Sequence, residues 1–186
     1  MNNVLLNKTF PLIALCRKIW YYIFMNKIYI LPINTDAYEF IKEKACKKHN
    51  IDINTLEIKR NEHGKPYFKN LPDFHFNISH STDILAVAIS DGKVGIDIEK
   101  LRTPDLRIAK RFCEDEQAYV TETDPKNRFF EVWTKKEAYL KYKGTGISGG
   151  LNSFSIFNTE IPLKTFKISD YIMSVCSKNC FEIIKT

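Results

Sequence analysis

Two acidic side chains stand two residues apart in an otherwise apolar stretch, Val94-Gly95-Ile96-Asp97-Ile98-Glu99. Alternate residues of a β-strand share one face, so the carboxylates of Asp97 and Glu99 are predicted to point the same way. Neighbouring carboxylates repel each other, and a shared cation removes that conflict. Hard oxygen ligands of this kind are typical of Mg²⁺ bound together with substrate phosphates. Two alternatives explain the same residues without a metal. The strand is a solvent-facing edge strand, or the two acids form ion pairs with Arg or Lys.

A second group of candidates lies in Trp133-Thr134-Lys135-Lys136-Glu137-Ala138-Tyr139-Leu140-Lys141. On a helix, Glu137 and Lys141 are i and i+4 neighbours. They form either a surface ion pair, or a third carboxylate for the metal with an ammonium that binds phosphate. Further lysines give the segment a local positive charge that suits an anionic ligand. These are Lys135, Lys136 and Lys143.

Two shorter segments carry polar side chains at turns. Gly64-Lys65-Pro66-Tyr67 puts a lysine on a rigid turn, and Phe76-Asn77-Ile78-Ser79-His80-Ser81 gathers polar residues where a strand ends. The ammonium of Lys65 and the imidazole of His80 are both able to donate to a phosphate. Turns whose polar side chains satisfy backbone groups explain the same residues without a ligand.

Strands and helices must position these side chains, and from Met25 the sequence alternates between the two patterns. The predicted strands are 27–31, 55–59, 74–79, 84–90, 94–99, 154–157, 163–168, 171–176 and 180–184. The predicted helices are one capped by Thr35 or Asp36 and ending near 48, then 106–112, 114–122 and 127–143, the last ended by Gly144. The dipeptide Asp91-Gly92 predicts a hairpin between strands 84–90 and 94–99. The order of elements predicts an α+β fold in two halves that divide near Gly92.

The segment before this pattern is apolar but not a membrane span. Residues 4–24 are interrupted by Arg17-Lys18, whereas a span needs about 20 mostly apolar residues. A signal peptide has small residues at a cleavage site after its apolar run, whereas here the apolar run is followed by bulky and basic residues. We expect neither a transmembrane segment nor secretion, and a peripheral amphipathic segment or a packing extension remains open.

Composition excludes several classes of protein. Hydrophobic residues make up 44% of the 186-residue chain, which is enough for a large core. The net charge is +6, but residues 1–35 carry four basic and no acidic residues, so the remainder is nearly neutral and does not require nucleic acid. The five cysteines lack CxxC spacing and the four histidines lack zinc-ligand spacing. We expect reduced thiols and a cytoplasmic location.

Taken together, these stretches resemble the 4′-phosphopantetheinyl transferases of the surfactin-synthetase-activating type. The specific part is Gly95-Ile96-Asp97 followed downstream by Trp-x-x-Lys-Glu-Ala-x-x-Lys, which ends at Lys141. The remaining matches follow the family's order, and they are Gly64-Lys65-Pro66, Phe76-Asn77-Ile78-Ser79-His80-Ser81 and Leu151-Asn152-Ser153-Phe154-Ser155-Ile156. The first half is shorter than is usual in the family and lacks its basic segment.

The resemblance implies an α+β fold of two similar halves, related by a pseudo-twofold, with the active site in the cleft between them. The divisions are an N-terminal extension (1–24), a shortened first half (25–92) and a second half (93–186) that carries the metal and catalytic residues. It further implies transfer of the phosphopantetheine arm of coenzyme A to a serine of an acyl or peptidyl carrier protein. The reaction requires Mg²⁺ and releases adenosine 3′,5′-bisphosphate. We expect a monomer, because both halves lie in one chain.

Carried over by position, the resemblance implies roles for seven residues. The metal ligands are Asp97, Glu99 and Glu137; the catalytic residues are Glu137 and Lys141; and the coenzyme A contacts are Lys65, Ser79 and His80.

The base that accepts the serine proton is less closely defined. Glu137 is the first candidate, directly or through water. Family members often carry a glutamate after the Arg-Phe motif, here Arg111-Phe112, which makes Glu116 the alternative. The spacing differs by one residue, so Gln117 also competes for that place.

Two other functions use the same residues. An Mg²⁺-dependent hydrolase would cleave a nucleotide pyrophosphate without a carrier protein. A non-catalytic relative would bind a carrier protein and transfer nothing.

Overall fold

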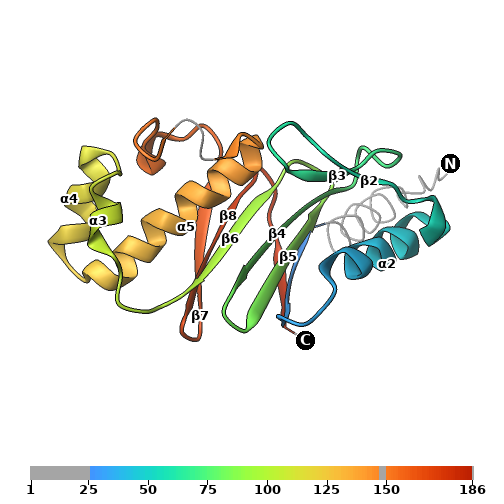
Figure 1. The fold of residues 1–186 in the computed structure, drawn as a ribbon, viewed down its shortest axis with the longest axis horizontal. Helices are drawn as coiled ribbons and strands as arrows, with labels where there is room; N and C mark the ends of the chain where they lie inside the picture. The colour runs from blue at the N-terminus through green and yellow to red at the C-terminus, as the bar shows by residue number, and fades with distance from the viewer. Residues whose placement is uncertain (1–25, 147–149, 186) are drawn as a thin grey trace, which may run out of the picture.

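The computed structural model describes residues 26–146 and 150–185, and these form a mixed α/β fold (Figure 1). The strands are β1 (Lys27–Pro32), β2 (Ile58–Arg60), β3 (Pro66–Phe68), β4 (His75–Ser81), β5 (Ile84–Ser90), β6 (Gly95–Lys100), β7 (Leu163–Ile168), β8 (Tyr171–Cys176) and β9 (Glu182–Lys185). The helices are α2 (Ala37–His49), α3 (Leu106–Ala109), α4 (Glu114–Glu122) and α5 (Pro125–Lys143), with 3₁₀ turns η1 (Ile53–Thr55) and η3 (Ile156–Asn158). The apolar segment 4–24 lies outside the described residues.

Two main sheets repeat one order of elements. The first runs β4-β5-β1-β9 and the second runs β6-β8-β7. In each, an opening strand (β1 or β6) is followed by helix and then by a hairpin (β4–β5 or β7–β8), whose second strand pairs antiparallel with the opening strand. The last strand, β9, departs from this order because it returns to the first sheet and pairs parallel with β1. The short pair β2–β3 stands apart from both sheets.

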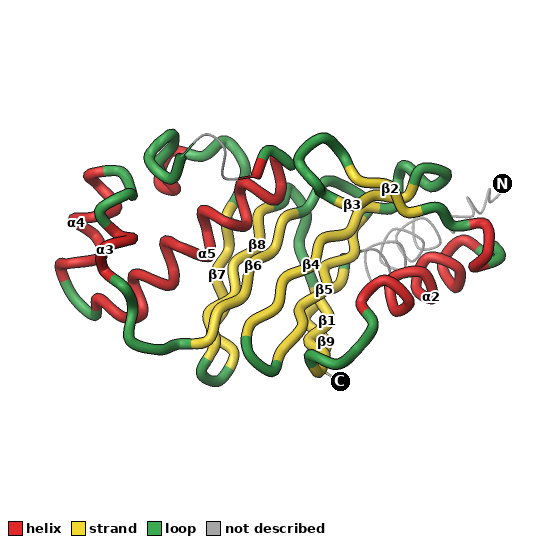
Figure 2. The backbone as a smooth tube through the Cα atoms, viewed as in Figure 1, coloured by secondary structure: helices red, strands yellow, loops and turns green. Residues whose placement is uncertain are grey.

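The sheets lie between two long helices, α2 on one side of the molecule and α5 on the other (Figures 1 and 2). Apolar residues of β1 and β5 pack against those of β6 and β8 and form the central core. A second core fills the space between the first sheet and α2, and a third lies beneath α4 and α5. Burial of the apolar residues in the second and third cores holds α2 and α5 against the outer faces of the two sheets.

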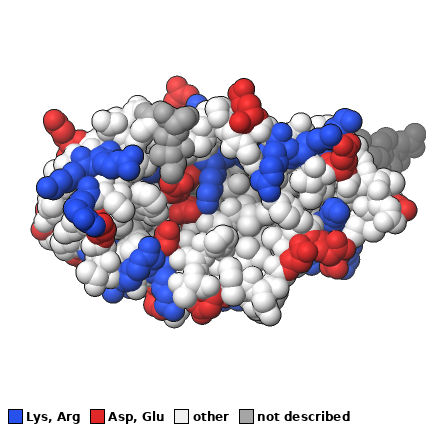
Figure 3. Space-filling model, in the orientation of Figure 1, with Lys and Arg blue, Asp and Glu red and all other residues white. Residues whose placement is uncertain are grey.

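The face of the molecule seen in Figure 3 carries basic and acidic side chains scattered among uncharged residues. This agrees with the near-neutral composition of the body of the chain. None of the described helices combines the length and hydropathy that a membrane crossing requires.

Most of the predicted elements are confirmed. The strand 84–90 and the helix 114–122 match β5 and α4 at both ends. Of the two candidate caps, Asp36 is the one used, since its carboxylate accepts from the backbone N–H groups of Tyr38 and Glu39. Helix α5 begins two residues earlier than predicted, with Pro125 in its first turn, where a missing N–H costs nothing.

The predicted hairpin at Asp91-Gly92 is wrong. Strand β5 pairs with β1 and β4, whereas β6 pairs with β8 in the other sheet. A two-residue hairpin turn of the type that Asp-Gly favours needs positive φ at both positions, and neither Asp91 nor Gly92 adopts it. The dipeptide instead carries the chain from one sheet to the next.

Several other boundaries differ from the prediction, including the helix expected at 106–112, which ends at Ala109, and the strand expected at 180–184, which begins at Glu182. His80 and Ser81 belong to β4 instead of the turn, which shortens to Thr82 and Asp83 with Thr82 at φ 54°. The predicted strand 154–157 gives way to the 3₁₀ turn η3, whose N-cap Ser155 accepts from the backbone N–H of Phe157. The predicted strand at 55–59 starts only at Ile58, because Asp52 caps η1 before it.

Helix α5 lies directly on β6 because β6 begins with a glycine. A Cβ atom at Gly95 would lie 2.0 Å from the carbonyl oxygen of Ala138 and 2.4 Å from the backbone nitrogen of Tyr142. Both distances are far below van der Waals contact, so only glycine allows this approach. The close packing brings the C-terminal turns of α5 over the acidic strand.

We expect Gly95→Ala to force α5 away from β6 and to destabilise the fold by about 1–3 kcal/mol or more. Thermal unfolding measures the loss. Gly92→Ala is the matched control, because its Cβ would meet the side-chain amide of Asn179, at 3.1 Å, and no backbone atom, so it should cost less than Gly95→Ala. Equal melting temperatures for the two variants would contradict the role given to Gly95.

Candidate active site

The site is built where β6 passes beneath the C-terminal half of α5. Asp97 is buried, and its Oδ1 accepts from Lys141 Nζ at 2.7 Å and from Ser79 Oγ at 2.8 Å. Its Oδ2 is also buried, yet it accepts no hydrogen bond from any described residue. Lys141, one of the residues in the last turn of α5, therefore pairs across to the strand.

Glu137 lies one helical turn before Lys141 and carries the second buried oxygen without a partner. Its Oε1 accepts no hydrogen bond within the described parts of the chain. Burial raises the pKa of Glu137, and repulsion from Asp97 raises it further. Burial likewise raises the pKa of Asp97, which the Lys141 ammonium opposes. The two carboxylates therefore repel each other, and the Lys141 ammonium, which is paired with Asp97, opposes that repulsion.

Glu99 completes the acidic group from the outer end of β6. Its Oε2 accepts from Ser81 Oγ at 2.9 Å and from Arg102 Nη1 at 3.3 Å. Its negative charge adds to the raised pKa of both Asp97 and Glu137, so all three acids share one electrostatic environment.

The donor set fits a magnesium ion. The two partnerless oxygens, on Asp97 and Glu137, are hard anionic ligands on a rigid strand and a rigid helix. Mg²⁺ is usually held by one or two carboxylates together with water and substrate phosphates, so a closed cage of protein ligands is not needed. The three acids are indeed spread wider than 4.8 Å, since they do not form a compact group of three ligand atoms.

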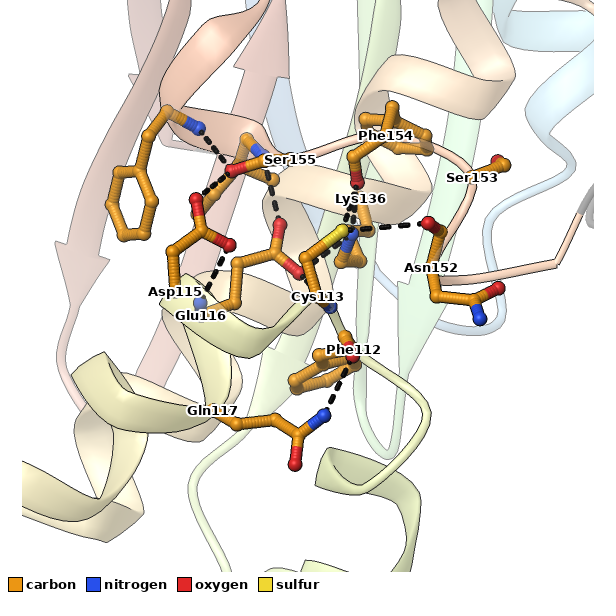
Figure 4. A network of polar contacts seen from close by, with 12 residues as sticks. Phe112, Cys113, Asp115, Glu116, Gln117, Lys136, Asn152, Ser153, Phe154 and Ser155 are labelled. Carbon is orange, nitrogen blue, oxygen red and sulfur yellow. Dashed lines mark hydrogen bonds and ion pairs between the residues drawn. The ribbon is translucent and has the colours of Figure 1, made fainter.

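One compact group does exist among the described residues, at the start of α4 (Figure 4). It consists of Cys113, Asp115 and Glu116, whose ligand atoms lie within 4.8 Å of one another. Glu116 already has partners on both oxygens, because Oε2 accepts from the Cys113 N–H at 2.9 Å and Oε1 from the Ile156 N–H at 2.8 Å. The bond from Cys113 caps α4, and Asp115 likewise accepts from the Glu116 N–H and from Ser155 Oγ, so each carboxylate oxygen of the group already has a hydrogen-bond donor.

Glu116 also forms a fully buried ion pair with Lys136. Lys136 Nζ lies 2.8 Å from Glu116 Oε2 and donates to the Phe154 carbonyl at 2.7 Å, and both side chains are 0% exposed (Figure 4). The alternative assignment of Glu116 as the base is therefore wrong, since no reactant reaches this carboxylate. The pair binds α5 to α4 and to the segment before η3.

Two of the lysines counted as a positive cluster are neutralised inside the protein. Lys136 is occupied by Glu116, and Lys135 Nζ lies 2.6 Å from Glu131 Oε1 on the preceding turn. The local positive charge predicted for this helix is thus reduced, and Lys141 is the ammonium that reaches the acids.

Lys65 lies at the C-terminal end of α5. Its Nζ donates to the carbonyl oxygens of Val94, Lys141 and Tyr142, at 3.0, 2.6 and 3.4 Å. Burial lowers the pKa of Lys65 to about 8. The ammonium satisfies carbonyls that the end of a helix leaves unpaired, and it joins the Gly64-Lys65-Pro66 turn to both α5 and β6.

The two remaining predicted contacts lie on opposite faces of β4. Ser79 is buried and bonded to Asp97, whereas His80, the next residue, is exposed. Alternation along a strand separates neighbouring side chains in this way. The site thus brings Ser79 to the acids and leaves His80 apart from them, so the coenzyme A contact of His80 stays a prediction.

The sequence interpretation missed two partners of Glu99. Ser81 was assigned to a turn, and Arg102 lies beyond the end of β6. Alternation would have found Ser81, because a strand prolonged to residue 81 places Asn77, Ser79 and Ser81 on one face. No comparable signal identifies Arg102.

Known proteins share much of this sequence. Residues 93–176 match the 4′-phosphopantetheinyl transferase superfamily profile, and residues 39–91 match the profile described as 4′-phosphopantetheinyl transferase, N-terminal. The chain is 32% identical over 156 residues to the 4′-phosphopantetheinyl transferase Sfp of Bacillus subtilis (strain 168), covering 74% of this chain and 70% of that protein. The chain belongs to the 4′-phosphopantetheinyl transferase superfamily.

Other members of the superfamily are matched over less of their length. The transferase psf-1 of Bacillus pumilus is 41% identical over 112 residues, which is 58% of this chain and 48% of psf-1. The transferase gsp of Aneurinibacillus migulanus is 37% identical over 142 residues, or 71% of this chain and 59% of gsp. The chain thus spans between about half and 70% of these superfamily members.

The partnerless carboxylate predicts a stabilising substitution. In the absence of divalent ions, Glu137→Gln should raise the free energy of unfolding near pH 8 by about 1 kcal/mol, an amount that partial exposure of the side chain keeps small. The native pKa of Glu137 is raised, so the wild-type site loses stability as pH rises from the ordinary glutamate value through the raised one. The extra free energy of unfolding of Glu137→Gln over the wild type should therefore vanish in acid and reach a constant value above the raised pKa of Glu137.

Chemical denaturation at several pH values measures this difference. Glu131→Gln is the control on the same helix, because its carboxylate already has Lys135 and Tyr119 as partners and its replacement should not stabilise. A Glu137→Gln protein no more stable than wild type at pH 8 would show that this carboxylate is not electrostatically strained.

Proposed function

We propose that this protein transfers the 4′-phosphopantetheine arm of coenzyme A to a serine hydroxyl of an acyl or peptidyl carrier protein. The by-product is adenosine 3′,5′-bisphosphate, and the reaction requires Mg²⁺. One observation carries the proposal: in a member of this superfamily, Asp97 and Glu137 each hold a buried carboxylate oxygen without a partner, and the Lys141 ammonium pairs with Asp97. The relatives of this chain named above are called 4′-phosphopantetheinyl transferases, which supports the same reaction.

The two halves, 25–92 and 93–186, are proposed to be related by an approximate twofold axis, with coenzyme A in a cleft between them. Support comes from the shared order of strand, helix and hairpin in the two sheets, β4-β5-β1 and β7-β8-β6. The acids of β6 lie beside β4, so a ligand that reaches them contacts both halves.

Asp97, Glu99 and Glu137 are the residues that would hold Mg²⁺. When bound, the ion neutralises charge on the pyrophosphate of coenzyme A. The partnerless oxygens of Asp97 and Glu137 support these two ligands directly. Support for Glu99 is electrostatic, because its charge raises the pKa of the other two acids.

Glu137 and Lys141 are proposed to carry the chemistry. The serine oxygen attacks the phosphorus that bears the pantetheine arm, and the pyrophosphate P–O bond breaks with its electron pair passing to the leaving nucleotide. Glu137 accepts the serine proton, directly or through water. The Lys141 ammonium stabilises the negative charge that develops on the phosphates.

Lys65, Ser79 and His80 are proposed to contact coenzyme A. Ser79 lies one hydrogen bond from Asp97 and therefore borders the reacting pyrophosphate. Lys65 lies against the last turn of α5, close to Lys141. His80 faces the other side of β4, where it would meet a more distant part of the ligand.

We place this activity in the cytoplasm and assign it to a monomer. None of the described cysteines forms a disulfide, which suits a reducing compartment. Both acidic elements and the lysine belong to one chain, so the site needs no second copy.

A carrier-modification assay tests the proposal. The protein is incubated with coenzyme A, Mg²⁺ and an apo carrier protein, and the carrier is weighed by mass spectrometry. A gain of one phosphopantetheine group supports transfer. Breakdown of coenzyme A without a carrier gain would identify a pyrophosphohydrolase, and a stable complex with neither change would identify a non-catalytic binder.

Asp97→Asn should abolish the carrier gain and leave the protein folded. The amide keeps the shape of the side chain but removes the charge that a metal ligand needs. The loss should exceed the roughly 10- to 100-fold typical of an outer partner. Circular dichroism checks the fold, and full activity of a folded Asp97→Asn protein would remove the metal assignment.

Lys141→Ala should lower kcat by about 10²–10³ while changing the KM for coenzyme A much less. The reason is that its ammonium acts on charge that develops in the transition state. Steady-state kinetics with varied coenzyme A separate the two constants. Lys135→Ala is the control on the same helix, because its ammonium is paired with Glu131, and an equal loss in both variants would argue against a specific role for Lys141.

A further inference from the structure

The edge strands β4 and β6 belong to different sheets and meet through side chains. Three alternate residues of β4 accept from three alternate N–H groups of β6. Asn77 Oδ1 accepts from Ile96 at 2.8 Å, Ser79 Oγ from Ile98 at 3.3 Å, and Ser81 Oγ from Lys100 at 3.1 Å. The matching alternation gives the junction a fixed register.

Two of these side chains also donate, and both donate to acids. Ser79 Oγ donates to Asp97 Oδ1 at 2.8 Å, and Ser81 Oγ donates to Glu99 Oε2 at 2.9 Å. Because each hydroxyl is held by an N–H of β6, its proton is directed at the carboxylate that precedes that N–H in sequence. The junction between the sheets therefore also orients the acidic side chains.

We propose that Ser81 is a positioning residue that fixes the Glu99 carboxylate toward the proposed metal site. This inference rests on the proposed function. Ser81 is 7% exposed and lies in β4, so the fold fixes the position of its hydroxyl group. Binding one oxygen of a carboxylate in this way sets the direction in which the other oxygen points.

The second partner of Glu99 cannot do the same work. Arg102 contacts the same oxygen at 3.3 Å, but its side chain is 63% exposed and follows the end of β6. Exposed ion pairs of this kind are weak and screened by salt. Without Ser81, Glu99 would follow Arg102 toward solvent, and the metal site would lose a well-placed charge.

Removing the hydroxyl should weaken divalent metal binding more than it weakens the fold. We expect Ser81→Ala to raise the dissociation constant for Mn²⁺ by roughly 10- to 100-fold, the range typical of an outer partner of a metal ligand. Ser81→Thr keeps the hydroxyl and should restore binding to within a few-fold of wild type.

The measurement is Mn²⁺ binding by electron paramagnetic resonance, with coenzyme A present and no carrier protein, so that no turnover is needed. Ser90→Ala is the matched control. Ser90 is a fully buried serine that donates to Asn26 and accepts from the Gly92 N–H, and it contacts no acid of the site. It should lower the melting temperature without changing the Mn²⁺ dissociation constant.

The outcomes separate this inference from the function on which it rests. If the wild type binds Mn²⁺ and Ser81→Ala binds it with the same dissociation constant, the role of Ser81 is overturned and the proposed function is left intact. Equal weakening in Ser81→Ala and Ser90→Ala also overturns it, because the effect would then be general destabilisation. Absence of Mn²⁺ binding in the wild type, together with no carrier modification, overturns both.

Discussion

The repulsion between Asp97 and Glu137 is the constraint that the rest of the second half must accommodate. Each of these carboxylates has a buried oxygen without a partner, and the Lys141 ammonium is paired with Asp97. Left alone, they would separate α5 from β6 or take up a proton. The structure holds them together by packing and by bonds made elsewhere, and a bound cation would relieve their repulsion.

Several independent contacts hold α5 in place against that repulsion. Gly95 lets the helix lie on β6 without an intervening side chain. Lys65 satisfies the carbonyls at one end of the helix. On another side, the buried pair of Lys136 with Glu116 binds α5 to α4 and to the segment before η3. A buried pair of this kind contributes little net stability, but breaking it is costly, so it fixes the position of the helix.

Local signals predicted the elements well and their long-range pairing poorly. Strand 84–90 and helix 114–122 were predictable because their apolar spacing and flanking turns are continuous in sequence. The pairing of β6 was not predictable in this way. The Asp91-Gly92 dipeptide indicates pairing with the preceding strand, whereas β6 pairs with β8, which lies far downstream in the sequence. Similarly, a lysine in a basic segment predicts a solvent-facing charge. The burial of Lys136 depends on Glu116, which only the folded chain brings to it.

The parallel pairing of β9 with β1 has a consequence for biosynthesis. The first sheet obtains its outer strand from a segment that follows every other described strand in the chain. While the ribosome is still making the second half, β1 lacks the strand that pairs with this edge in the described structure, and open strand edges can recruit other chains. The first sheet therefore reaches its full set of described strands only after synthesis passes Glu182.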